Sequence, residues 1–164
     1  MHLSAGMLTV LALILGLGSG RAPNACQVLS ARDVARVQGA RPKSTKLKET
    51  ANRELEVSQC LFTLPRLSDS VSVDVMRGDT RAFWRKHFPD EHRAANKPRA
   101  EREAQAMRIA GVGDDAVWSG NRLAGALYVL KGDTIVRIGL GGDRPQEQKI
   151  EKAKQLAARA LRRL

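Results

Sequence analysis

The pair Gly132-Asp133 lies between two apolar runs and predicts the two-residue turn of a β-hairpin. If the loop has two residues, the register of the hairpin is fixed and Tyr128 stands opposite Arg137. One face is then apolar, while the other carries the tyrosine ring beside the guanidinium, where the two can stack. The apolar face consists of Leu127, Val129, Val136, Ile138 and Leu140. The hairpin therefore predicts a sheet with one buried face.

The N-terminus has the pattern of an export signal. Residues 1–20 contain no Lys, Arg, Asp or Glu, and they include an apolar run from Leu8 to Leu17. This pattern predicts a signal peptide over 1–20 that is cleaved after Gly20, with a retained N-terminal anchor as the alternative. Residues 21–164 would form a single domain, secreted or periplasmic, that contacts the membrane only through an uncleaved signal.

The two cysteines, Cys26 and Cys60, both follow the predicted signal. An even pair in an exported protein predicts one disulfide. A bridge closing a loop of this length stabilises the fold by about 3–4 kcal/mol in the loop-entropy model. The alternative is a reactive or metal-binding pair, but the pair has neither Cys-x-x-Cys spacing nor a nearby histidine.

The formal net charge is +11, and all of it belongs to residues 21–164. An excess of this size attracts polyanions. Acidic residues are interleaved with the basic ones, which instead favours an ordinary solvated surface. Nucleic acid is disfavoured because no exposed aromatic residues alternate with the basic clusters. If a polyanion is bound, the expected contacts are Arg85, Lys86, Arg159, Arg162 and Arg163.

Helix and strand signals define the rest of the fold. Ser30 with Asp33 has the form of a capping box, and Gly39 is typical of a helix end. Runs 55–64 and 71–77 predict two antiparallel strands, with Ser72 and Asp74 facing outward. The polar, basic residues 40–53 predict a mobile connection. Later elements are expected as a helix capped by Asp79, a helix over 99–110, a strand at 116–118 and a C-terminal helix from an Asp143 cap to Leu164.

This order of elements predicts an α+β domain in which an antiparallel sheet of about five strands is covered by helices. The C-terminal helix is expected to bury an apolar stripe against the sheet. Its members are Ile150, Ala153, Leu156, Ala157, Ala160, Leu161 and Leu164.

Three groups of polar residues have both a chemical and a structural interpretation. His87, Asp90, Glu91 and His92 crowd together, but Pro89 breaks the helical spacing that would align the histidines on a metal. The loop 111–115, Gly-Val-Gly-Asp-Asp, matches no phosphate or calcium motif and is more typical of a turn. The serines, Ser30, Ser72 and Ser119 among them, lack a nucleophile elbow. We therefore predict no catalytic residue, no metal and no cofactor.

Several stretches resemble a known family: LSARDVARVQG after the first cysteine, SQCLFTL around the second, VSVDVMRG, GVGDDAVW, LYVLKGDTIVRIGLGG and the terminal EKAKQLAARAL. They are similar to small bacterial secreted proteins and lipoproteins with an LpqN-like or PsbP-like layout. The resemblance spans most of residues 26–164. It implies an α/β/α sandwich and export, with no shared catalytic set. Residues 23–25 depart from the lipoprotein members, so lipid attachment at Cys26 is not expected.

These features favour a non-catalytic exported domain of the cell envelope, a binding or accessory protein. Its expected partner is another envelope protein or an anionic surface polymer, and we expect a monomer. The alternative is a charge-driven nucleic-acid or polyanion-binding protein. A hydrolase is the third possibility, and it would need a titratable pair in a cleft.

Overall fold

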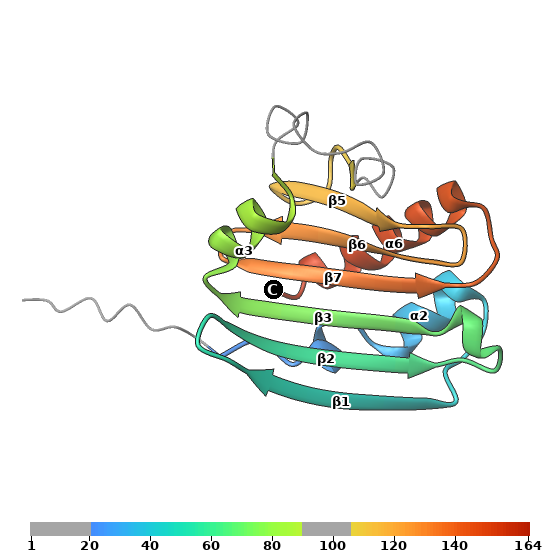
Figure 1. Cartoon of the computed structure of the whole chain (residues 1–164). Helices are drawn as coiled ribbons and strands as arrows, with labels where there is room; N and C mark the ends of the chain where they lie inside the picture. The colour runs from blue at the N-terminus through green and yellow to red at the C-terminus, as the bar shows by residue number, and fades with distance from the viewer. Residues whose placement is uncertain (1–20, 90–105) are drawn as a thin grey trace, which may run out of the picture.

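The computed structural model describes residues 21–89 and 106–164, which form one antiparallel sheet with helices packed on it (Figure 1). The sheet order is β1-β2-β3-β7-β6-β5-β4, so neighbours in the sheet are also neighbours along the chain except where β3 meets β7. The strands are β1 (Ser44–Ala51), β2 (Leu55–Thr63), β3 (Val71–Gly78), β4 (Met107–Arg108), β5 (Asp115–Gly120), β6 (Ala124–Lys131) and β7 (Thr134–Gly141). The helices are α1 (Ala25–Val28), α2 (Ala31–Gln38), α3 (Thr80–His87) and α6 (Gln146–Leu161), with a 3-10 turn η1 (Leu67–Asp69).

The α+β class is confirmed, but the sheet is larger than predicted. It has seven strands among the described residues, where about five were predicted; the two that were not predicted are β1 and β4. The expected mobile connection 40–53 contains β1, an edge strand whose eight residues are all exposed and which therefore has no apolar alternation. The helix expected over 99–110 is wrong at its end, where Met107 and Arg108 form β4. Residues 99–105, like the predicted signal 1–20, lie outside the described residues.

The predicted hairpin register is confirmed. Lys131 pairs with Thr134 and Tyr128 with Arg137. Gly132 has φ 60°, whereas Asp133 does not have a positive φ. A glycine at the first central position only is the pattern of a type II′ turn, whose twist suits a two-residue hairpin loop.

One face of the sheet carries the main core, under α1, α2 and α6. These helices lie behind the sheet in the view of Figure 1. The capping box of Ser30 and Asp33 begins α2, and Gly39 ends it with φ 82°, both as predicted. Trp118 fills the core over Gly125, where any Cβ would collide with the indole ring. On this face the core includes Phe62, Val73, Leu127, Val136, Ile138 and Leu140.

The C-terminal helix α6 packs as expected through its small residues and Leu156, but its start and its end differ from the prediction. The N-cap is Pro145 rather than Asp143, and Leu164 is exposed. Lys149 near the start is buried, and its ammonium donates hydrogen bonds to the carbonyls of Asn121, Arg122 and Gly142. This lysine ties the helix to the turn between β5 and β6.

The opposite face is covered differently. Helix α3, capped by Asp79 as predicted, packs Trp84 and Phe88 on Met76, Leu130 and Ile135 at one end of the sheet. Within the described residues, the expected α/β/α sandwich is therefore complete on one face and limited to this end on the other. The rest of this face carries the polar side chains described below.

The predicted disulfide is confirmed. Cys26 and Cys60 are joined with a Cα–Cα distance of 5.1 Å, which ties α1 to the middle of β2. Beside the bridge, the backbone N–H of Ala25 donates a 3.0 Å hydrogen bond to Ser58 Oγ. Within the described ranges, no helix has the length and apolar character needed to cross a bilayer.

Candidate binding surfaces

A row of polar side chains crosses the sheet on the face opposite the main core. It consists of Gln59, Asp74, Arg137 and Tyr128, which are direct cross-strand neighbours on β2, β3, β7 and β6. We call it the polar row. Its members occupy alternate positions of strands whose other residues fill the core, so the strand period alone puts them all on this face.

Hydrogen bonds run along the polar row. Gln59 Nε2 donates to Asp74 Oδ1 at 2.8 Å, and Arg137 Nη1 donates to Asp74 Oδ2 at 3.0 Å. Arg137 Nη1 also donates to Ser72 Oγ, while its Nε donates to Tyr128 Oη at 3.2 Å. The guanidinium lies 5.7 Å from the centre of the Tyr128 ring, so the predicted stacking is confirmed. Arg137 is thereby fixed in one orientation.

Asp74 and Arg137 form an ion pair that is held in place by its neighbours. Asp74 is 5% exposed, which corrects the expectation that it faces solvent. Burial lowers the pKa of Arg137, but the charge of Asp74 and the Tyr128 oxygen outweigh this effect and raise the pKa above its ordinary value. Arg137 is thus a permanent cation whose charge is largely compensated by Asp74.

A shallow groove of about 340 Å³ lies beside Arg137. Gly139 contributes to its floor, and a Cβ at this position would collide with Ser72 Oγ and crowd the Arg137 guanidinium. The absence of a side chain therefore lets the guanidinium lie along β7. Within the described residues, Arg137 Nη2 has no hydrogen-bond partner and lies on the groove side of the pair. The walls combine apolar and hydroxyl groups: Leu61, Ser72, Ser119, Ala126 and Tyr128.

The basic residues singled out from the sequence do not form one patch. Arg163 donates to Asp33 Oδ2 at 2.7 Å, and Arg159 lies 3.6 Å from the other oxygen of the same carboxylate. Arg162 bonds the carbonyl of Ala158 in its own helix. These three are at the end of α6, whereas Arg85 and Lys86 are exposed on α3, across the sheet.

Asp33 is the acid that holds the end of α6. Burial raises its pKa, but hydrogen bonds from Arg163 and Ser30 and the charge of Arg163 outweigh burial and lower the pKa to about 2. The carboxylate therefore stays charged at neutral pH and joins α2 to α6. Two of the predicted polyanion contacts are used in this internal junction.

The other candidate groups have structural partners where the structure describes them. Asp114 accepts hydrogen bonds from the backbone N–H of Gly132 and from Lys131 Nζ, and these contacts lower its pKa. Asp115 accepts from Trp84 Nε1 at 2.9 Å and from Arg108. The loop 111–115 thus holds the β6–β7 turn and α3. His87 is exposed, while Asp90, Glu91 and His92 lie outside the described residues.

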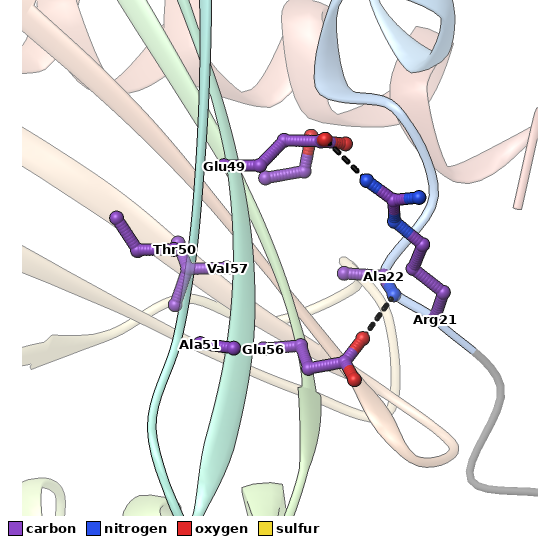
Figure 2. Close-up of a pocket in the computed structure, with 8 residues that line it drawn as sticks. Arg21, Ala22, Glu49, Thr50, Ala51, Glu56 and Val57 are labelled. Atoms are coloured by element: carbon purple, nitrogen blue, oxygen red, sulfur yellow. Dashed lines mark hydrogen bonds and ion pairs between the residues drawn. The ribbon is translucent and has the colours of Figure 1, made fainter.

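A hollow of about 320 Å³ lies where the described chain begins (Figure 2). The Arg21 guanidinium pairs with Glu49, and the backbone N–H of Ala22 donates to Glu56 Oε2 at 3.1 Å. Two acids of the β1–β2 hairpin, Glu49 and Glu56, are thus engaged by residues 21 and 22. We interpret this hollow as the place where residues 21 and 22 are attached to the β1–β2 hairpin.

Sequence reasoning placed Tyr128 beside Arg137 but missed Asp74 and Gln59 as their neighbours. The register of β3 against β7 joins segments far apart in sequence, and no local signal sets it. The signal that was available is Asp74 itself, a charge in the middle of a valine-rich strand. Comparisons of this chain with protein-family models, with curated proteins and with solved structures found no significant match in any of the three.

Proposed function

We propose that this protein is a non-catalytic exported binding domain of the bacterial cell envelope, and that it contacts a partner protein through the groove beside Arg137. The observation that carries the proposal is the fixed guanidinium, held by Asp74 and Tyr128, with one terminal nitrogen on the groove side. Tyrosine and arginine are enriched at the energetic centres of protein interfaces.

The chemistry of the polar row supports binding more than catalysis. Both oxygens of Asp74 already accept hydrogen bonds within the polar row, and the raised pKa of Arg137 keeps its proton in place near neutral pH. A fixed donor with a compensated charge suits a neutral acceptor such as a peptide carbonyl. The disulfide supports export because such bonds persist in oxidising compartments. The LpqN-like or PsbP-like layout remains part of this proposal.

A matched pair of leucines makes the proposal testable. Leu61 lines the groove and is 41% exposed, whereas Leu47 is 40% exposed and points to the opposite face. A photo-crosslinking residue at position 61 of the full-length protein, in the cell that exports it, should yield a discrete adduct with one envelope protein. The same residue at position 47 should not.

The variant Leu61→Glu should weaken that adduct, measured with a crosslinker at Ser72, while Leu47→Glu should leave it unchanged. Equal adducts from positions 61 and 47, or none from 61, would contradict the proposed surface.

A further inference from the structure

A second surface lies on the outer side of α2. A cleft of about 690 Å³ is lined there by Arg32, Arg36 and Arg41. The other described residues around it are alanine, glycine and proline, so within the described part of the chain its polar side chains are three guanidinium groups. We call it the arginine cleft.

The local sequence explains why the three arginines line one cleft. The capping box at Ser30 fixes the start of α2, and Arg32 and Arg36 then lie one helical turn apart. Val34 faces the core and is fully buried, which turns these arginines outward. Gly39 then takes φ 82°, a left-handed conformation that ends the helix and redirects the chain toward Arg41.

The charges of the arginine cleft are not compensated. Within the described residues, Arg32, Arg36 and Arg41 have neither an ion pair nor a side-chain hydrogen bond. The acid of α2, Asp33, is engaged by Arg159 and Arg163. Asp69, whose carbonyl accepts from Gln38 at the end of α2, is engaged by Arg144 at 2.9 Å.

We propose that the arginine cleft binds a phosphate group carried by an anionic polymer of the cell envelope. Guanidinium groups donate paired N–H bonds that match the oxygens of phosphate, and three such groups offer more donors than a carboxylate can accept. Bound phosphate also reduces the mutual repulsion of the three cations. The cleft lies on the helix side of the sheet, so it can be occupied while the Arg137 groove is occupied too.

The chain supplies a matched control for the test. Arg32→Gln with Arg36→Gln removes two positive charges from the arginine cleft. Arg85→Gln with Lys86→Gln removes two exposed charges from α3, which were expected polyanion contacts but do not line the cleft, so this pair also tests that earlier expectation. The probe is inorganic polyphosphate, titrated calorimetrically into the full-length protein at fixed ionic strength. The cleft pair should weaken binding by about tenfold or more, since two charge-assisted contacts are lost. The α3 pair should change it by no more than about twofold, the effect of net charge alone.

Three results would overturn the proposal. Equal losses from both variants would show a diffuse charge effect with no site. Inorganic phosphate binding as tightly as polyphosphate would show a site for the free ion. Tighter binding of single-stranded DNA of matched charge, lost in the cleft variant, would make nucleic acid the partner.

Further measurements separate loss of the phosphate site from loss of charge and from loss of folding. Arg32→Lys with Arg36→Lys keeps the charge but loses the paired donors, so it should recover only part of the affinity. An unchanged melting temperature of each variant should accompany every loss, because these side chains are exposed. The photo-crosslink at Leu61 should persist in the cleft variants, which separates this proposal from the proposed function.

Discussion

The two surfaces both present arginine, but the arginines differ in what holds them. Arg137 is partly buried and is fixed by Asp74, Tyr128 and Ser72, whereas Arg32 and Arg36 are exposed and unpaired within the described residues. A compensated guanidinium keeps its direction but attracts anions weakly, while an uncompensated one attracts anions but is not held in place. The number of arginines therefore says less about binding than the position of each carboxylate.

The largest effect is expected at Asp74. The variant Asp74→Ala leaves the guanidinium of Arg137 without its counter-charge in a partly buried position, which should cost about 2–4 kcal/mol of unfolding free energy. Urea denaturation followed by circular dichroism would measure it. The double variant Asp74→Ala with Arg137→Leu should recover part of the loss, and a single variant as stable as the native protein would show that the pair has no structural role.

The next effect concerns Asp33 and depends on pH. Its pKa is lowered from 3.8 to about 2 in the folded protein, so the stability it contributes is present above about pH 4 and is lost as the pH falls toward 2. The shift corresponds to about 2 kcal/mol at neutral pH. Asp33→Asn should lose that amount at pH 7, and its stability should approach that of the native protein near pH 2. A loss that is the same at both pH values would contradict the assignment.

A smaller effect is expected at Tyr128. The variant Tyr128→Phe keeps the ring near Arg137 but removes the oxygen that accepts from Nε, which should cost about 0.5–1.5 kcal/mol. The melting temperature would measure it. Because Phe88 packs on the same ring at 4.9 Å, replacement by leucine should cost more than replacement by phenylalanine. A Tyr128→Phe variant as stable as the native protein would show that the hydrogen bond matters little, and a leucine variant more stable than the phenylalanine variant would show the same for the ring contact.

The smallest effect completes the comparison. Arg36→Gln should change the unfolding free energy by no more than about 0.5 kcal/mol, because among the described residues Arg36 forms neither an ion pair nor a side-chain hydrogen bond. Any change should be a slight gain at low ionic strength, where repulsion among the arginines is least screened. Thermal unfolding at low and high salt would detect it. A loss comparable to that of Asp74→Ala would mean that Arg36 supports the fold.

The sequence predicted local structure well and distant pairing poorly. The capping box at Ser30, the left-handed Gly39 and the hairpin register are set by residues a few positions apart, and all three are confirmed. The edge strand β1 was missed because no part of it is buried, so the alternation that marks a strand never arises. Asp143 was favoured as a cap by residue type, yet the helix begins only after Pro145.

The candidate surfaces show the same contrast between features set by neighbouring residues and features set by distant segments. The stacking of Tyr128 and Arg137 follows from the hairpin, so it was predictable. Asp74 enters the polar row only when β3 pairs with β7. The arginine cleft was missed because Arg32 and Arg36 read as an ordinary solvated helix face, and only the structure shows that Asp33 is engaged elsewhere.

The junction of β3 and β7 also bears on how the sheet assembles. On each side of it the strands follow one another along the chain, so each side can form through contacts close in sequence, whereas the junction joins residues more than sixty positions apart at Asp74 and Arg137. We therefore expect its closure to be slower than the pairing of strands within either side. A shift of the register by two residues there would set Asp74 opposite Ile135 or Gly139 and leave the charges of Asp74 and Arg137 unpaired. We therefore expect the ion pair to favour the native register over a register shifted by two residues.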